Sequence, residues 1–545
     1  MERRLAPLLC LALAACAPES SLDPDETGAL DLVEDGEIVT DDKADDFLSA
    51  TAREFVISGS DTVVLESEYR TRSAADRLRR ARELVSLRQI AIAWFLNQYL
   101  VDKGDEDSNA GYGGFGAMAK AGDYEALNLR ETAPLTYAFD FQQLVAGRID
   151  LMTRLPTTRT SDPAVRTFVL TVGLPTNAEM AALETNAEWY RQAPWDAWNP
   201  STVEASRRRD LTVSIRNERE SRDAWFDYPQ LFADGVLDID VHFGWDYHDG
   251  YHVLHARALN TWLRARGFTA PVASFDQLTR TSGAFTRTIS ANGRTVRVEV
   301  RIFYGRTGSE TDPDTDAGGR TLERDMRASL RSRDVIVYSG HSGPFYGFAL
   351  ANWRRTSEGD LDDSEMESVE MSSRYQIVLA EGCDTYQTGA AFARNPAHPG
   401  LRNLSVITTT SFSNASTPDA VQDFLTRLIE RDSRGRHRPR TVRSLLADLD
   451  DNGGSGFHTM YGMHGVDALP RLHPYADREM LGELCAANAD CGGLGNMCVR
   501  MPDGARRCTA ACTSDDACGA GSRCMPVGSS SSRAVYGSAC MTTAR

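Results

Sequence analysis

The chain has 545 residues, of which 41% are hydrophobic and 25% charged, and a formal net charge of -18 at pH 7. One hydrophobic core rarely serves so long a chain, so we expect several domains. The acidic balance argues against a nucleic-acid partner, because phosphates require a basic surface. It also argues against general adhesion to anionic lipid.

A targeting segment is expected at residues 1–15, where two arginines precede an apolar run that is too short to span a bilayer. The run ends in Leu-Ala-Ala-Cys, which is similar to the lipobox of bacterial lipoproteins and implies a diacylglycerol on Cys16 after cleavage before it. By the same resemblance, Ala17 in place of Asp implies the outer membrane of a Gram-negative cell. The alternative is an ordinary secretory signal cut at a small residue. No later stretch is apolar enough for a membrane span.

Residues 16–50 are acidic and poor in large apolar side chains, which is typical of a disordered tether. An α+β N-terminal domain is expected over 51–230. Its helix is predicted over 73–99, with Ser73 as N-cap, because apolar residues recur at helical spacing. Its strands are predicted near 127–144 and over 168–172.

Strands alternate with helices from about residue 231 to 480, which predicts an α/β domain with a mostly parallel sheet flanked by helices. The expected strands are 236–243, 296–304, 334–340, 375–382 and 404–410. The expected helices are 252–266, 322–330 and 417–429, the last with Thr417 as its cap and Pro418 at its first position.

Two of these strands end beside a reactive side chain. The strand over 334–340 is followed by His341, and the strand over 375–382 is followed by Cys383. Parallel strands present their carboxyl ends at one edge of a sheet, where sites in such folds lie. If the strands are neighbours, the imidazole and the thiol emerge side by side. A thiol beside an imidazole is the smallest pair of side chains that supports nucleophilic catalysis, because the imidazole can take the proton and leave a thiolate.

The two motifs, a strand then His-Ser-Gly and a strand then Glu-Gly-Cys, resemble those of clan CD cysteine peptidases, which include caspases, metacaspases, legumain and gingipains. The resemblance spans roughly residues 236–430 and implies a caspase-hemoglobinase-like fold. It implies that Cys383 is the nucleophile and His341 the general base and acid. It therefore predicts a cell-envelope endopeptidase that acts on a peptide or protein substrate.

The resemblance also implies an oxyanion site formed by backbone groups around Gly382 and by the N–H of Ser342 or Gly343. The family usually has Gly directly after the histidine, so Ser342 is a departure. Glu381 occupies the place of an acid that lines the S1 pocket, which implies a basic or amide-bearing P1 residue. The alternative for Glu381 is a hydrogen-bonded carboxylate. Asp384, the second acid of the cysteine motif, is assigned with it to substrate binding.

Three alternatives accompany this prediction. The sequence around Ser342 is similar to the nucleophile elbow of serine hydrolases, with His464 completing a triad, although Pro344 stands where the second glycine belongs. A non-catalytic binding lipoprotein on the same scaffold is another. A metal site is the third, from the histidines at 242, 248, 252 and 255. The glutamate of an HExxH motif is missing, so we expect packed histidines and no metal or other cofactor.

The last segment, 481–545, is rich in cysteine and poor in apolar residues, so disulfides replace a core. We expect two small modules with four cysteines each, and three connectivities are open for each module. Cys383 is expected to stay outside these bridges. The eight paired cysteines are Cys485, Cys491, Cys498, Cys508, Cys512, Cys518, Cys524 and Cys540.

Overall fold

The computed structural model forms two compact units, one of Val39–Pro474 and one of Met1–Ile38 with Tyr475–Arg545. Each is described by itself. The signal segment, Cys16, His248 and Asp384 lie outside the described residues, so the predictions made for them stay predictions. The structure describes residues 30–32, 47–104, 127–185, 194–195, 198–246, 250–343, 347–383, 385–411, 413, 416–431, 435–450, 459–470, 474–475, 481–486, 488–491, 496–519, 521–528 and 535–542.

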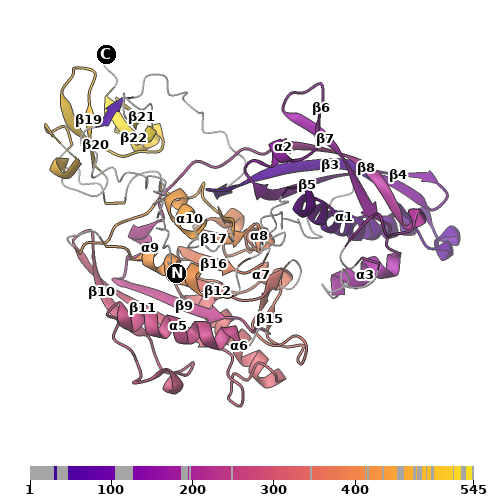
Figure 1. Cartoon of the computed structure of the whole chain (residues 1–545), viewed down its shortest axis with the longest axis horizontal. Coiled ribbons are helices and arrows are strands. Elements are labelled where there is room, and N and C mark those ends of the chain that lie inside the picture. Colours follow the sequence, from indigo (N-terminus) through magenta and orange to yellow (C-terminus); the bar gives the residue numbers. More distant parts are fainter. Residues whose placement is uncertain are drawn as a thin grey trace, which may run out of the picture. The chain divides into compact units, whose positions relative to one another are not determined.

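The larger unit contains an eight-stranded sheet with the order β10-β11-β9-β12-β16-β17-β18-β2 (Figure 1). Strands β11, β9, β12, β16 and β17 run parallel to one another, whereas β10, β18 and β2 pair antiparallel. The prediction of a mostly parallel α/β sheet is therefore confirmed. The bounds are β2 Leu48–Ser49, β9 Val236–Phe243, β10 Phe285–Ala291, β11 Arg294–Tyr304, β12 Val335–Ser339, β16 Gln376–Glu381, β17 Leu404–Thr409 and β18 Tyr461–His464.

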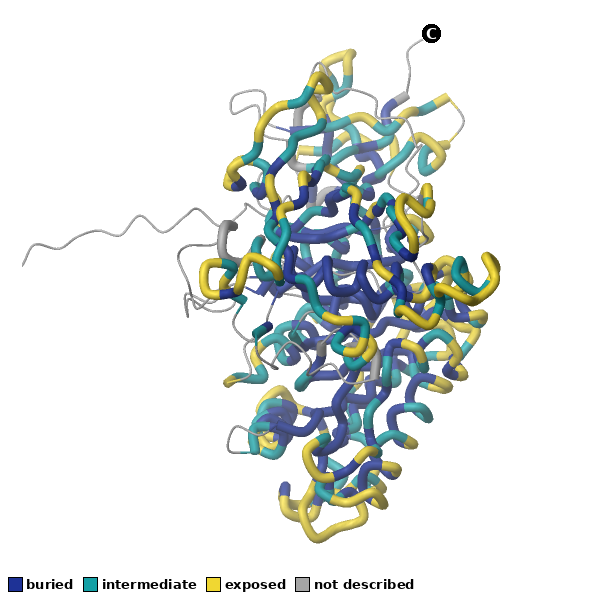
Figure 2. The backbone as a smooth tube through the Cα atoms, turned by 90° about the vertical axis from the view of Figure 1, so that its right-hand side faces the viewer, coloured by how far each residue is buried: buried dark blue, intermediate teal, exposed yellow. Residues whose placement is uncertain are grey.

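Helices cover both faces of this sheet, and every residue of β12, β16 and β17 is buried between them. On one face, α6 and α8 pack on apolar side chains of β12 and β16. On the other face, His255 of α5 contacts Phe243 of β9. Figure 2 shows buried residues gathered in the strands and the inner helix faces. The helices are α5 Tyr251–Ala265, α6 Asp316–Ser332, α7 Asp363–Met366, α8 Tyr386–Ala393, α9 Asp419–Leu428 and α10 Val442–Asp450.

Three short strands continue from the carboxyl end of β12 as a separate sheet, in the order β13-β14-β15. They begin directly after His341 and turn the chain back beside it. Their bounds are β13 Ser342–Gly343, β14 Gly347–Ala349 and β15 Asp360–Leu361.

The N-terminal part of the larger unit is a six-stranded antiparallel sheet, ordered β4-β5-β3-β8-β7-β6. The 31-residue helix α1 (Ala74–Gly104) packs its apolar face on this sheet. The Ser73 hydroxyl accepts a bond from the Asp76 N–H at 3.1 Å, so the predicted cap is confirmed. The other elements are β3 Ala52–Val64, β4 Leu127–Ala133, β5 Thr136–Arg148, β6 Thr158–Arg159, β7 Val165–Gly173, β8 Arg208–Asn217, α2 Leu151–Arg154, α3 Asn177–Thr185 and α4 Tyr228–Leu231.

The segment before β3 joins the two sheets of this unit. Strand β2 pairs with β18 at the edge of the eight-stranded sheet, and β3 begins three residues later in the other sheet. The Phe47 ring packs against Tyr386 of α8 and His464 of β18. The Thr51 hydroxyl donates to the carboxylate of Asp450 at 2.7 Å. Residues that the sequence assigned to a tether thus complete a sheet edge.

The smaller unit is a five-stranded sheet with the order β20-β19-β1-β21-β22. Its central strand β1 comes from the predicted tether and pairs with β19 and β21. The strands are β1 Leu30–Leu32, β19 Asn496–Arg500, β20 Arg506–Ala510, β21 Ser522–Gly528 and β22 Val535–Thr542. The 3₁₀ turns of the two units are Ser67–Thr71, Ala205–Arg207, Phe275–Gln277, Pro399–Leu401, Asn488–Cys491 and Asp515–Ala517.

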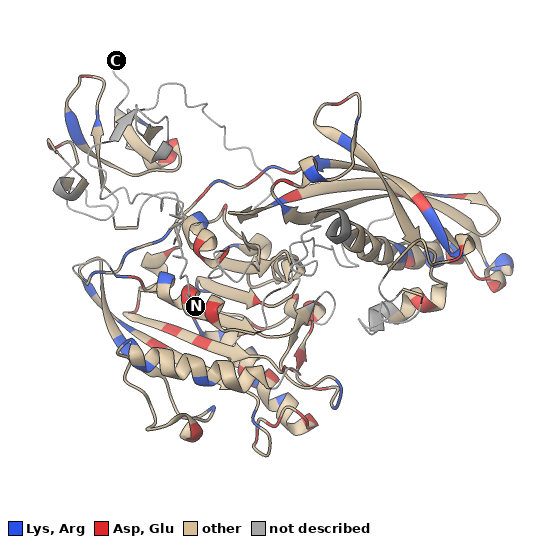
Figure 3. Cartoon of the chain, in the orientation of Figure 1, with Lys and Arg blue, Asp and Glu red and all other residues tan. Residues whose placement is uncertain are grey.

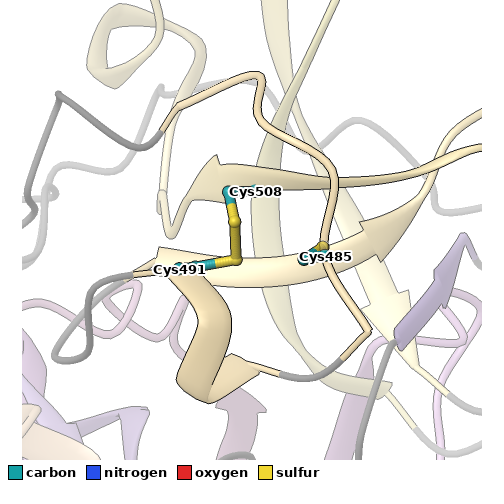
Figure 4. A group of neighbouring side chains, drawn as sticks. All are labelled: Cys485, Cys491 and Cys508. Atoms are coloured by element: carbon teal, nitrogen blue, oxygen red, sulfur yellow. A yellow bond between two sulfur atoms is a disulfide. The ribbon is translucent and has the colours of Figure 1, made fainter.

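All eight cysteines between Cys485 and Cys540 are in disulfides, as predicted. In each module the first cysteine pairs with the third and the second with the fourth, so one of the three open connectivities occurs twice. Figure 4 shows the Cys491–Cys508 bridge between the short helix and β20. The bridges are Cys485–Cys498, Cys491–Cys508, Cys512–Cys524 and Cys518–Cys540.

Figure 3 shows acidic and basic residues interspersed along the described elements. Among the described helices, none combines the length and apolar character needed to cross a bilayer.

Candidate active site

The two strands that carry the predicted catalytic residues are hydrogen-bonded neighbours. In the parallel pairing of β12 with β16, Ser339 lies opposite Glu381. The Gly340 N–H continues the pairing by donating to the carbonyl of Glu381 at 3.1 Å. His341 and Cys383 each follow this cross-strand pair by two residues. They therefore leave the sheet at equivalent positions of adjacent strands, and adjacent strands lie about 4.8 Å apart.

Cys383 is the one cysteine in the described part of the chain that lies outside a disulfide, and its side chain is partly exposed. The Ser342 hydroxyl donates to its carbonyl at 3.0 Å, and the Thr409 hydroxyl donates to the carbonyl of Gly382 at 2.6 Å. A Cβ on Gly382 would lie 2.0 Å from the Ser342 Oγ. Only glycine permits this approach. The peptide around the thiol is therefore held by Ser342 of β13 and by Thr409 of the neighbouring strand β17.

His341 is enclosed by an acid and an aromatic ring. Its Nε2 lies 3.1 Å from Oδ2 of Asp246, within the distance of an ion pair if the imidazole is protonated. The edge of the ring faces Trp353, with ring centroids 5.5 Å apart. Trp353 in turn contacts Trp245. Asp246 is buried, so its charge acts on the imidazole with little screening by water.

Asp246 was not among the predicted site residues. It follows β9, which is the other neighbour of β12 in the sheet. The Gly244 N–H donates to the carbonyl of Ser339 at 2.9 Å, and the Trp245 N–H donates to that of Ala349 at 3.1 Å. These bonds extend β9 beyond its last residue and direct Asp246 toward His341. The available signal was an acidic residue just past the end of a buried strand. The histidines close to it in the sequence drew the prediction to a metal site instead.

The Ser342 hydroxyl is buried against Gly382 and committed to the Cys383 carbonyl. The Ala349 N–H donates to the His341 carbonyl at 3.2 Å, and Ser342 lies opposite Phe348 in the next pair of the ladder. Hydrogen-bonded and non-hydrogen-bonded pairs alternate in antiparallel strands. The backbone N–H of Ser342 is thus directed away from β14, whereas that of Gly343 is directed into the ladder.

His464, the partner expected for a serine nucleophile, lies elsewhere. It is paired with Val406, in the middle of β17, and its ring packs against Phe47 and Tyr386. A Cβ on Gly389 of α8 would lie 2.2 Å from this ring. The site is instead formed beyond the carboxyl ends of β12 and β16. These positions do not bring His464 to Ser342.

Glu381 is 7% exposed, and its carboxylate accepts a bond from the Ser339 hydroxyl at 2.8 Å. A second bond comes from the Ser413 side chain. Burial raises the pKa of Glu381 to about 7, against the lowering effect of the two serines. Glu381 is thus a hydrogen-bonded carboxylate, as the alternative expected. The assignment of Glu381 to substrate binding stays a prediction.

The predicted histidine cluster is divided between the two faces of the sheet. His242 stacks on Phe303, and its Nε2 lies 2.9 Å from the Ser329 hydroxyl of α6. His255 stacks on Tyr251 on the opposite face. Burial lowers the pKa of His242 to about 3 and that of His252 to about 4, so both are neutral at pH 7. Among the described residues, the groups spaced for a metal ion are cysteines already engaged in disulfides.

Comparison with known proteins found no matching family model, no similar curated protein and no similar solved structure. Any functional assignment therefore depends on the residues themselves.

Proposed function

We propose that the protein is a cysteine endopeptidase in which Cys383 is the nucleophile and His341 the general base. The observation that supports this most is the register of β12 and β16, which brings the two residues to equivalent positions of adjacent strands. The buried Asp246 at 3.1 Å from His341 supplies the third member of a nucleophile, base and acid constellation. The likeness of the two motifs to clan CD peptidases belongs to the same proposal.

The proposed reaction has two halves. His341 takes the thiol proton, and the thiolate attacks the carbonyl carbon of the peptide bond. The backbone N–H groups of Cys383 and Ser342 stabilise the oxyanion that forms. His341 then gives its proton to the leaving amine, and water hydrolyses the thioester by the same route. Asp246 orients the imidazole and stabilises its charged form.

The test is peptidolysis of a mixed peptide pool, measured together with iodoacetamide labelling of Cys383 at neutral pH. Peptidolysis should vanish in Cys383→Ala and His341→Ala, and labelling should slow strongly in His341→Ala. Ser342→Ala should retain most activity, since its hydroxyl only supports the Cys383 carbonyl. An inactive Ser342→Ala with an active Cys383→Ala would establish the serine hydrolase instead. A wild-type protein without peptidolysis or rapid labelling would support the binding lipoprotein.

We further propose that the mature protein is anchored to the outer membrane through an acylated Cys16, on the strength of the N-terminal sequence alone. Cys16→Ser should release the protein from the membrane fraction, because it removes the one acylation site that the sequence suggests. Cys10→Ser is the matched control, since this cysteine lies in the segment that is cleaved off, and it should leave fractionation unchanged. Membrane retention of Cys16→Ser would refute the anchor.

A further inference from the structure

We infer that Glu381 is a positioning residue, which fixes the ends of β12 and β16 and the loop after β17 in one arrangement. The inference rests on the proposed function, because it assigns a role to a residue that supports His341 and Cys383. It departs from the expectation that this carboxylate contacts the substrate.

The contacts of Glu381, on β16, reach two other segments of the chain. Its backbone carbonyl accepts from the Gly340 N–H at 3.1 Å, directly before His341. Its side chain accepts from the Ser339 hydroxyl at 2.8 Å, also on β12. Ser413, in the loop that follows β17, supplies the other side-chain bond. One residue, two positions before Cys383, is thus tied to the histidine strand by both backbone and side chain.

Burial separates this carboxylate from bulk solvent. Glu381 is 7% exposed, and both serine hydroxyls are directed to its carboxyl group. A P1 side chain that took the place of either hydroxyl would have to displace one of these bonds. Displacement would leave a buried hydroxyl without a partner, which costs about 1–3 kcal/mol. The present contacts therefore favour a supporting role over direct recognition.

The arrangement depends on the charge of the carboxyl group. Ionised, it only accepts hydrogen bonds, so both hydroxyls can donate to it. Protonated, it becomes a donor at one oxygen and competes with them. Its pKa of about 7 places this change in the working range of a thiol–imidazole pair. The titratable group that faces it from β18 is Tyr461, which burial and Glu381 keep neutral. We expect the ionised form to be the productive one.

The test compares Glu381→Gln with the wild type over about pH 5 to pH 9, using substrates with Arg, Asn or Ala at P1. Glutamine keeps the shape but cannot ionise. The variant should lose the ionisation near pH 7 from its kcat profile and should lower kcat by about 10-fold, within the ~10²-fold that a 1 Å misplacement costs. KM and the order of preference among the three substrates should not change.

Two further variants sharpen the test. Ser339→Ala should move the same ionisation to higher pH, because the Ser339 bond lowers the pKa of Glu381. Asp334→Asn is the matched control. It removes another carboxyl with a raised pKa, about 6, at the opposite end of β12, and should leave the profile unchanged.

Three results would overturn the inference: an altered P1 preference in Glu381→Gln, an unchanged pH profile in that variant, or an unchanged profile in Ser339→Ala. The rate of Cys383 alkylation across the same pH range, measured on the same proteins, separates this inference from the proposed function. If the wild type shows no peptidolysis, the endopeptidase proposal fails. The ionisation near pH 7 must still disappear from the alkylation profile of Glu381→Gln, or the positioning role fails as well.

Discussion

Asp246 is the carboxylate that faces the imidazole proposed as the general base. It is buried, 3.1 Å from the Nε2 of His341, and held there by the backbone bonds of Gly244 and Trp245. In the proposed reaction, this buried negative charge stabilises the imidazolium that forms when the thiol gives up its proton. The contact also orients the imidazole ring, because it holds Nε2 toward the acid.

We expect Asp246→Asn to lower kcat/KM at least about 10-fold, and less than the ~10⁴-fold loss found for the buried aspartate of the serine-protease triad. An amide cannot stabilise the imidazolium, although it preserves the packing. Steady-state kinetics and the pH dependence of Cys383 alkylation measure the effect. Asp314→Asn is the control, because that carboxylate pairs with Arg355 at 2.8 Å, and it should stay within about twofold of the wild type. Equal losses in both variants would show a general electrostatic effect.

Gly382 should be intolerant of any side chain. A Cβ there would lie 2.0 Å from the Ser342 Oγ and 2.8 Å from the Gly340 carbonyl oxygen. Gly382→Ala should therefore separate the ends of β12 and β16 and abolish measurable peptidolysis, with slower alkylation of Cys383. Adding Ser342→Gly removes the shortest contact and should restore part of the activity. Gly400→Ala, at a position with open space but a φ of +61° that strains any side chain, lowers stability without a clash at the site and is the control. Full activity in Gly382→Ala would contradict the geometry.

Secondary structure was predictable where one regular pattern of apolar residues extends over the whole segment. The segment over 236–243 predicted β9 with its observed bounds, because its apolar residues recur at every second position, as in a strand. The helix expected at 417–429 begins later, since Pro418 takes the cap position and the Thr417 hydroxyl accepts from the Asp419 N–H at 3.0 Å. The outer strands β10, β18 and β2 were missed. Strands β18 and β2 pair with segments distant in sequence, which no local pattern reveals. Strand β10 forms a hairpin with β11, and its Asn292-Gly293 turn was the available signal.

The residues of the candidate site were likewise predicted only where the local sequence indicates them. His341 and Cys383 were found because each ends a buried run, and parallel strands bring such ends together. Asp246 was missed, since its approach depends on bonds from Gly244 and Trp245 to two other strands. The burial of Glu381 was also beyond the sequence. The bond from Ser413 was beyond it too, because only the tertiary fold brings this loop residue near the end of β16.

The element that joins the two sheets of the larger unit should contribute strongly to stability. Phe47 is 2% exposed, and a Cβ on Gly462 would lie 2.1 Å from its ring. Phe47→Ala should lower the free energy of unfolding by about 3–5 kcal/mol, the usual cost of emptying a buried aromatic site. Urea denaturation measures this loss. Val64→Ala, at a side chain 57% exposed, should change it by no more than about 0.5 kcal/mol. A similar small change in Phe47→Ala would mean that the edge strand is dispensable.

At the scale of the whole molecule, burial displaces the pKa values of two opposing sets of groups. Among the described residues, six carboxyls have raised pKa values, four of them by a large shift, so the folded protein retains protons that the unfolded chain has already lost. Four histidines have lowered pKa values, three of them by a large shift, so the unfolded chain binds protons that the folded protein does not. The four carboxyls with large shifts are Asp334 at about 6, Glu381 and Asp360 at about 7, and Asp450 at about 8, and the pKa values of Asp223 and Asp423 are also raised. The three histidines with large shifts are His242 at about 3, and His252 and His437 at about 4, and the pKa of His255 is also lowered.

The sign of the pH dependence follows from proton uptake. Below about pH 6.5 the two sets oppose each other, because protonation of the unfolded histidines favours unfolding while the carboxyls favour folding. Above that pH only the carboxyls contribute, and unfolding releases their protons. Stability should therefore fall as the pH rises from about 6.5 to about 8.5. Thermal unfolding of the wild type at these two pH values should show the lower Tm at the higher pH.

Asp450 should account for much of this loss, since its pKa of about 8 is the highest of the four. Asp450→Asn removes the ionisation and can keep one of the bonds from Thr51 and the Tyr461 N–H. The Tm difference between the two pH values should shrink in this variant. Asp140→Asn should leave it unchanged, because Asp140 has a lowered pKa and is ionised in both the folded and the unfolded protein at each pH. A wild-type Tm that rises with pH over this range would show that the buried carboxyls ionise without cost, and the raised pKa of Glu381 would then lose its basis.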